Sequence, residues 1–192
     1  MSFLTGTSAE VMYSSITTGT QLNTFTTEDN LMKTLPPMII PAGFFYNLGA
    51  AGKSLRVKAM GRLGTTATPT FTFTVRLRTN RTWAADGVAW SSAAITAGST
   101  VTLAPFFIDF EIVCRALVDG ATGLTLAGLG EVRSGTGFAA TGGVFSIPNA
   151  NTGFTVTLDN SVTQYLYLSV ACGTSNSLNL VQLEMLKVYG EN

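Results

Sequence analysis

The 192-residue chain contains no histidine. Ser-His-Asp and Cys-His catalytic groups are therefore excluded, and the side chain that most often serves as a base near neutral pH is missing. One pair of carboxylates has a suggestive spacing: Asp109 and Glu111 lie two residues apart on an expected strand, with Cβ atoms roughly 7 Å apart. An inverting glycosidase uses such a pair, but its acid needs a desolvated pocket lined by aromatic residues, which the sequence does not indicate. We expect no catalytic residue and no enzyme activity.

The chain also has few charged residues. Charged residues make up 11% of the chain, against about 25% in a typical soluble protein. Eleven basic and eleven acidic residues give a net charge of zero, which argues against nucleic acid as a partner, because such binding depends on a basic face. A chain with so few charges is expected to cover much of its surface with protein partners.

Long apolar runs and cysteine frameworks are missing as well. No stretch approaches the ~20 apolar residues of a membrane-spanning helix, and residues 1–15 lack the pattern of a signal peptide, so we expect neither membrane insertion nor export. Cys114 and Cys172 stand at inward positions of strand patterns and are expected to be free thiols. Asp159 and Asn160 resemble calcium-loop residues, but loops contain such residues in general, and we expect no metal and no cofactor.

What the chain does contain is strict alternation of apolar and polar residues. In the segment 70–78, Phe71, Phe73, Val75 and Leu77 alternate with threonine and arginine, which predicts a strand with one buried face. Residues 53–64 alternate in the same way, and a turn at residues 65–69 leads us to expect a β-hairpin over residues 53–78. The polar sides of these strands carry a cluster of basic residues, which we expect to be solvated and to pair with Asp109 and Glu111: Arg56, Lys58, Arg62, Arg76, Arg78 and Arg81.

The whole chain follows this pattern and shows no convincing helix. About eight or nine short antiparallel strands separated by Gly, Pro, Asn and Thr turns predict an all-β jelly-roll β-sandwich over residues 21–192. Residues 1–20 have no clear period and are expected to form an extended N-terminal arm. The apolar residues of this arm are candidate partner-binding residues: Phe3, Leu4, Val11 and Tyr13.

Four sequence blocks resemble a recurrent type of structural protein from tailed-bacteriophage virions. They are the turn Ile40–Gly43, the strand Gly52–Gly61, the turn and strand Pro69–Leu77, and the strand end Glu111–Arg115. The resemblance covers about residues 38–117 and consists of turn and strand motifs without catalytic signatures. It implies a jelly-roll component of the virion, assembled in the host cytoplasm and located on the capsid, the tail or a fibre.

Composition and resemblance together predict a non-enzymatic capsid decoration or minor capsid protein. Its expected partners are copies of itself and other virion proteins such as the major capsid protein. The homotrimer that we expect is implied by the resemblance alone. The threonine-rich outer face of residues 70–78 is expected to contact another subunit.

A receptor-binding module of a tail fibre, recognising host-surface glycans, is the alternative. In that case aromatic side chains would stack on sugar rings. The candidates are Trp83, Trp90, Tyr165 and Tyr167, and exposure of the two tryptophans in one groove is the feature that would favour this function.

Overall fold

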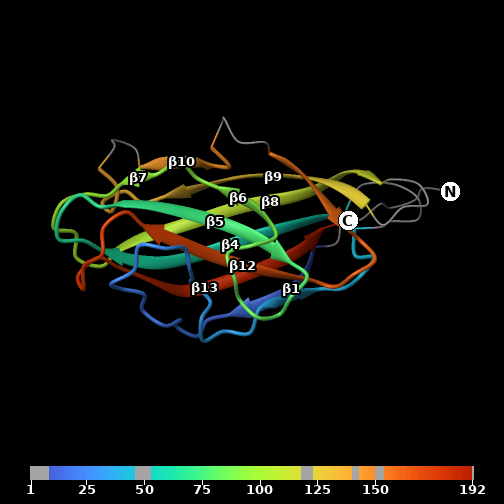
Figure 1. Ribbon diagram of the computed structural model, residues 1–192, viewed down its shortest axis with the longest axis horizontal. Helices are drawn as coiled ribbons and strands as arrows, with labels where there is room; N and C mark the ends of the chain where they lie inside the picture. The colour runs from blue at the N-terminus through green and yellow to red at the C-terminus, as the bar shows by residue number, and fades with distance from the viewer. Residues whose placement is uncertain (1–8, 46–52, 118–122, 140–142, 150–153, 192) are drawn as a thin grey trace.

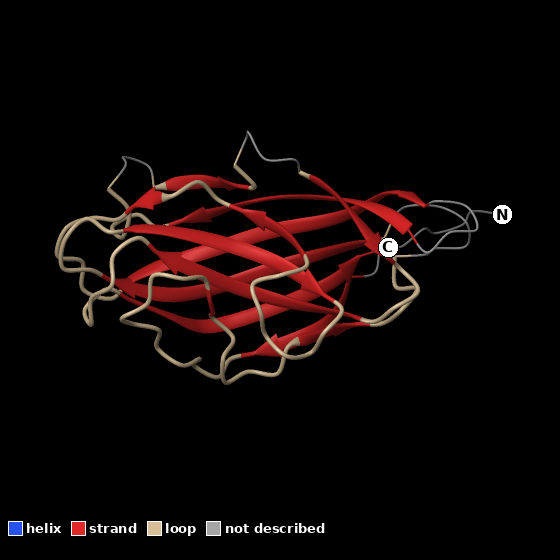
Figure 2. Cartoon of the chain, viewed as in Figure 1, coloured by secondary structure: helices blue, strands red, loops and turns tan. Residues whose placement is uncertain are grey.

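The computed structural model describes residues 9–45, 53–117, 123–139, 143–149 and 154–191. Within these ranges the chain forms strands and loops without a helix (Figure 2). Two antiparallel sheets pack face to face, with β5 and β12 crossing over β4 and β8 (Figure 1). The predicted all-β sandwich is confirmed.

Seven strands form the larger sheet, in the spatial order β1, β13, β4, β8, β9 and β10, with β11 also pairing with β9. Their bounds are β1 (Ala9–Ser15), β4 (Ser54–Gly64), β8 (Ala104–Leu117), β9 (Gly123–Arg133), β10 (Val144–Ile147), β11 (Thr155–Asp159) and β13 (Leu180–Glu191).

Six strands form the smaller sheet, in the spatial order β2, β12, β5 and β6, with β3 pairing with β12 and β7 with β5. Their bounds are β2 (Asp29–Asn30), β3 (Met38–Ile40), β5 (Thr70–Arg78), β6 (Val88–Ser91), β7 (Ile95–Thr96) and β12 (Gln164–Cys172). The described residues therefore hold thirteen strands rather than eight or nine. β2, β3 and β7 have only two or three residues and are too short to show alternation, and β1 lies in the segment that was expected to be an arm.

The inner faces of the two sheets form one apolar core. Phe71, Phe73, Val75 and Leu77 are buried, as the alternation predicts. The rings of Phe73 on β5 and Phe106 on β8 lie 5.1 Å apart, which joins the two sheets through aromatic contact. Burial of these side chains against each other is the main source of stability of such a sandwich.

The predicted hairpin over residues 53–78 is wrong. β4 pairs with β13 and β8 in the larger sheet, whereas β5 pairs with β12, β6 and β7 in the smaller one. The connection at residues 65–69 thus crosses from one sheet to the other. Alternation fixes which face of a strand is buried, but both arrangements bury the same faces, so it does not identify the neighbouring strand.

The prediction that residues 1–20 form an extended arm outside the sandwich is also wrong from residue 9 onward. β1 pairs with β13 at the edge of the larger sheet, with a bulge between Val11 and Tyr13 that interrupts its alternation. Beyond β1, the backbone N–H of Gly19 donates to Leu183 O at 2.7 Å. This part of the arm therefore lies on its own chain. Phe3 and Leu4 lie outside the described residues.

Candidate functional site

The aromatic residues proposed for sugar stacking are mostly in the interior. Trp90 is fully buried, and its Nε1 donates to Phe154 O at 2.9 Å. Tyr167 is also buried, and its hydroxyl donates to Arg81 O. Trp83 is half-buried and packs on Tyr167, with 5.3 Å between the centres of the two rings. Tyr165 is half-buried. Because Trp90 is in the core, the two tryptophans do not line a common groove, and neither Trp90 nor Tyr167 is available to stack on a sugar ring.

The partner-binding residues of the arm divide into two kinds. Val11 is 57% exposed and lies beside Tyr189 of β13. Tyr13 is half-buried and packs against the core, and its hydroxyl donates to Pro36 O at 3.0 Å. Of the two candidate residues that the structure describes, Val11 is therefore the one whose side chain is available to a partner.

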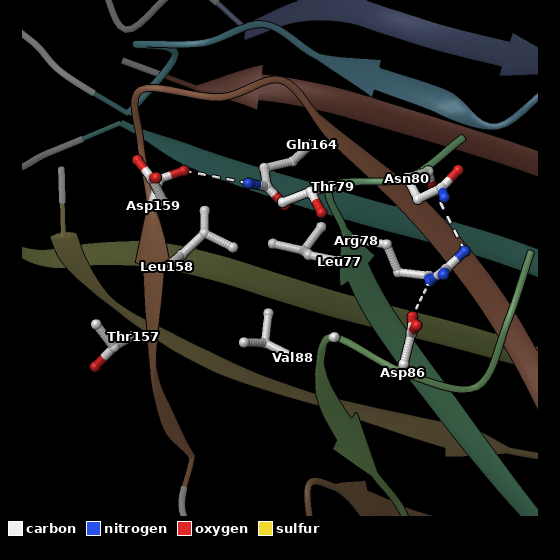
Figure 3. Close-up of a pocket in the computed structure, with 11 residues that line it drawn as sticks. Leu77, Arg78, Thr79, Asn80, Asp86, Val88, Thr157, Leu158, Asp159 and Gln164 are labelled. Carbon is white, nitrogen blue, oxygen red and sulfur yellow. Dashed lines mark hydrogen bonds and ion pairs between the residues drawn. The ribbon is translucent and has the colours of Figure 1, made fainter. Parts of the chain in front are cut away.

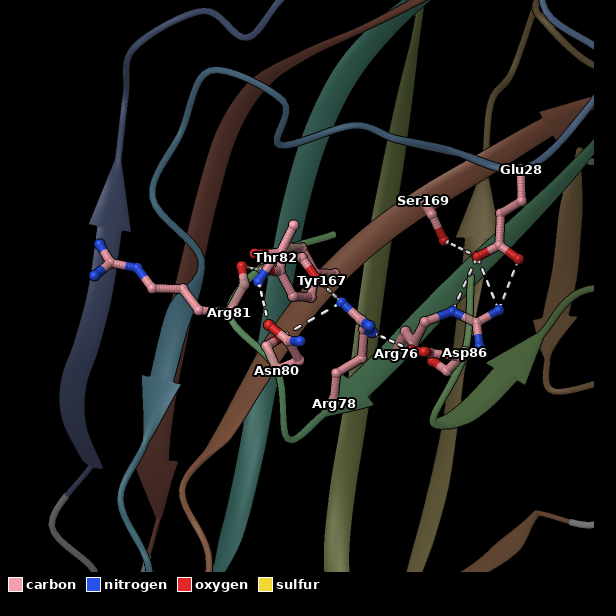
Figure 4. A network of polar contacts seen from close by, with 9 residues as sticks. All are labelled: Glu28, Arg76, Arg78, Asn80, Arg81, Thr82, Asp86, Tyr167 and Ser169. Carbon is pink, nitrogen blue, oxygen red and sulfur yellow. Dashed lines mark hydrogen bonds and ion pairs between the residues drawn. The ribbon is translucent and has the colours of Figure 1, made fainter. Parts of the chain in front are cut away.

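A buried polar network covers the outer face of the smaller sheet (Figure 4). Arg76 Nε and Nη2 donate to the carboxylate of Glu28 at 2.7–3.1 Å, and Nη1 donates to Asp86 O at 3.0 Å. Ser169 Oγ donates to the same carboxylate. The side chains of Arg76 and Glu28 are 9% and 20% exposed, so this ion pair is largely withdrawn from water.

Arg78 continues the network along β5. Its guanidinium pairs with the Asp86 carboxylate and donates to Thr82 O. The hydrogen bond from Arg78 lowers the pKa of Asp86. The loop between β5 and β6 is thereby fastened to the sheet, and the expectation that Arg76 and Arg78 are solvated is wrong.

The threonine face of β5 is covered in part by this same chain. Thr74 is 3% exposed and shares a hydrogen bond of 2.8 Å with Ser91 Oγ on β6. Thr70 and Thr72 stay half-buried. The prediction that another subunit covers this face is therefore wrong at Thr74, since a neighbouring strand already does so.

The outer face of the larger sheet is different, because it carries most of the paired charges. Arg56 donates to both oxygens of Asp109, at 3.0 and 2.9 Å, which confirms the expected pairing of the basic strand with Asp109. This hydrogen bonding lowers the pKa of the Asp109 carboxyl, with the positive charges of Arg56 and Lys58 acting in the same direction. A catalytic acid needs a raised pKa, so the environment of Asp109 is the opposite of a glycosidase site.

Apolar side chains are exposed on this outer face beside the charges. Phe107 of β8, Leu129 of β9 and Val144 of β10 are 37%, 65% and 54% exposed. In the pairing register, Phe107 lies between Met60 and Arg133, and the Arg133 guanidinium lies 5.7 Å from the Phe107 ring centre. We call this surface, formed by the outward residues of β1, β13, β4, β8, β9 and β10, the outer face.

A cavity of about 500 Å³ opens between the two sheets at the ends of β5 and β11 (Figure 3). Leu77, Val88 and Leu158 give it an apolar wall, while Asp159 and Gln164 stand at its polar side. The sequence offered one signal for Gln164: it is the polar member of an inward series that continues with apolar residues, Leu166, Leu168, Val170 and Cys172.

The two cysteines are buried free thiols, as predicted. Burial raises the pKa of both Cys114 and Cys172. Neither thiol is therefore suited to act as a nucleophile, since the thiolate is the reactive form.

The part of the chain that the structure describes holds no group of three or more Cys, Asp and Glu side chains arranged for a metal ion. Over the same ranges, no helix is long and apolar enough to cross a membrane.

No protein-family model matches the chain, and no curated protein matches it. Among solved structures, a peanut lectin determined with a nine-residue peptide is similar at 8% sequence identity and a TM-score of 0.40, covering 95% of this chain and 97% of the lectin chain.

Proposed function

We propose that this chain is a non-enzymatic structural protein of a tailed-bacteriophage virion. In this proposal it is a capsid decoration or minor capsid protein that binds copies of itself and the major capsid protein. Three copies per assembly is the number implied by the resemblance of residues 38–117 to such proteins. The observation that carries the self-assembly is the composition of the outer face.

The outer face combines two properties of a protein interface. Exposed Phe107, Leu129 and Val144 supply apolar area that favours burial against a partner. Their strands are neighbours in the same sheet, so these side chains share one broad surface.

One row of paired residues across the outer face runs from basic to acidic side chains. Lys58 and Lys187 are opposite each other on β4 and β13, while Asp109 and Glu131 are opposite each other on β8 and β9. The face as a whole carries both signs, because Glu184 lies on β13 and Arg133 on β9. Another copy of the same chain offers both charges in complementary positions, which favours self-association and fixes its orientation.

The glycan-binding tail-fibre alternative is not favoured by the residues first proposed for it. Trp90 and Tyr167 are buried, and their hydrogen bonds hold them to the chain's own backbone. An experiment must still decide whether the protein lies on the capsid or on the tail of the particle.

Gold-labelled antibodies raised against the recombinant chain test the location, applied to purified particles of the phage whose genome encodes it. Label distributed over the capsid is the expected result. Label confined to the tail would replace the capsid proposal with the fibre alternative, and particles without label, in a preparation where the major capsid protein is labelled, would contradict the virion proposal.

A further inference from the structure

The cavity between the sheets contains an acceptor that the chain itself does not satisfy. Gln164 is 2% exposed, and its Nε2 donates to Asp159 O at 3.1 Å. That bond sets the orientation of the amide, since the reverse orientation would place two oxygens against each other. Oε1 is then the one buried side-chain nitrogen or oxygen without a partner among the described residues.

An unsatisfied acceptor at this place requires a donor from outside the chain. A buried carbonyl without a hydrogen bond has lost its water and gained nothing in return. Figure 3 shows the Gln164 amide near Asp159 and Thr79, on the side of the cavity that faces Leu77 and Leu158. Gln164 lines the cavity, so a molecule bound there supplies the missing donor when the amide turns its buried Oε1 toward it.

The other polar groups of the cavity include the Asp159 carboxylate and the hydroxyls of Thr79 and Thr157, together with the Asn80 amide and the Arg78 guanidinium. Asp159 Oδ1 accepts two hydrogen bonds, from Ser161 N at 2.8 Å and from Ser161 Oγ at 2.7 Å. Thr79 and Thr157 line the same space. Hydroxyl groups suit this set, because each can donate to a carboxylate or amide oxygen and also accept from threonine.

Anions fit this cavity poorly. The cation that lines it is Arg78, whose side chain is 5% exposed and whose guanidinium is already bound to the Asp86 carboxylate and to backbone oxygens of the β5–β6 loop. Asp86 and Asp159 both line the opening and repel negative charge.

The apolar wall of the cavity narrows the class of ligand further, because the ligand must also present apolar surface. Leu77 and Leu158 are buried and Val88 is half-buried, so one side of the cavity offers aliphatic surface. Sugars carry C–H surface on one side of the ring and hydroxyls at its rim, which matches an aliphatic wall opposite acceptors. The volume of about 500 Å³ falls within the range of about 300–1,000 Å³ for ligand sites.

We propose that this cavity binds a neutral polyhydroxy compound, a monosaccharide or the terminal sugar of a glycan, through Gln164 Oε1. The site uses no aromatic stacking and is separate from the four aromatic residues first considered. It does not depend on self-association, because its residues come from β5, the β5–β6 loop, β6, β11 and β12 of one chain.

Titration of the ¹⁵N-labelled full-length chain with neutral monosaccharides, followed by NMR, tests the proposal. The probes are glucose, galactose, mannose, fucose and N-acetylglucosamine, with inorganic phosphate and tetramethylammonium as charged comparisons. At least one sugar is expected to give saturable shifts of the Gln164 side-chain amide and of the Thr79 and Thr157 backbone signals. No shift with any sugar, or shifts with a charged probe alone, would overturn the proposal.

Gln164→Met removes the acceptor at nearly constant side-chain length and is expected to weaken binding by about tenfold or more. Gln182→Met is the matched control, because Gln182 Nε2 likewise donates to a backbone oxygen, Gly19 O at 3.0 Å, away from the cavity. Should Gln164→Met fail to fold, Thr157→Val on the exposed part of the wall replaces it and is expected to weaken binding as well. Affinity unchanged in the folded cavity variant would overturn the assignment.

Discussion

Replacing Glu28 by glutamine should destabilise the fold strongly although the change is small. Glutamine keeps the size and one acceptor oxygen but removes the negative charge that faces Arg76. The Arg76 guanidinium, 9% exposed and bound by three hydrogen bonds to that carboxylate, is then left without a counter-charge. Removing one partner of a buried pair costs about 3–5 kcal/mol.

The partial exposure of Glu28, at 20%, places this pair near the lower end of that range. We expect the free energy of unfolding of Glu28→Gln to fall by about 3 kcal/mol, which corresponds to a Tm lower by about 6–12 °C for a chain of this size. Replacing both partners, as Glu28→Gln with Arg76→Met, should recover part of the loss, because no unpaired charge is left in the interior.

Urea unfolding followed by circular dichroism measures these differences. Glu131→Gln is the matched control, since the Glu131–Arg133 pair is exposed at 41% and 57% and should contribute less than about 1 kcal/mol. A Glu28→Gln variant no less stable than Glu131→Gln would refute the reasoning, because it would mean that water screens the Arg76 charge.

Three further predictions follow from other sites. Gly128→Ala should lower the free energy of unfolding by about 1–3 kcal/mol, because an added Cβ would lie 2.5 Å from Trp90 Cε2 and 2.6 Å from Phe110 Cζ. Gly135→Ala is the control: its added Cβ meets no atom within 4 Å, so it should be neutral in the same urea titration. Asp109→Asn should be less stable than the wild type at about pH 6 and should approach the wild-type stability below about pH 4. The folded pKa of Asp109 lies below its usual 3.8, so the carboxylate stabilises the fold above pH 3.8 and this stabilisation disappears as the pH falls through the folded pKa. A stability difference between variant and wild type that is equal at both pH values would contradict this. Cys114 and Cys172 should react with a thiol reagent much more slowly in buffer than in urea at about pH 8, because burial raises their pKa; equal rates would show that the thiols are accessible.

Much of the fold was predictable because alternation reports burial directly. The inward series of β5 and the outward positions of Arg56 and Asp109, which pair with each other, both agree with period two along the strands. The placement of β4 and β5 in different sheets does not, since their buried faces are the same in a hairpin and in a sandwich connection.

The polar sites were harder to predict because their partners are distant in sequence. Glu28 lies 48 residues before Arg76 in the chain, and no local pattern links them. Trp90 was a candidate for sugar stacking only under the glycan-binding alternative, and the space left by Gly128 on the facing sheet admits its ring into the core. Gln164 carried a usable signal, as a polar residue in an inward apolar series, although sequence does not show that its oxygen lacks a partner.

Self-association through the outer face is the central claim, and light scattering after size-exclusion chromatography tests it most directly. The wild-type chain should elute as an assembly of three times the chain mass of 20.2 kDa. Leu129→Lys, at a position 65% exposed and opposite Glu111, should leave the fold intact and shift the mass to that of one chain, whereas Ile39→Lys, 52% exposed on the other sheet, should leave the assembly unchanged. A wild-type chain that elutes as a monomer, or an assembly that persists unchanged in Leu129→Lys, would contradict the account.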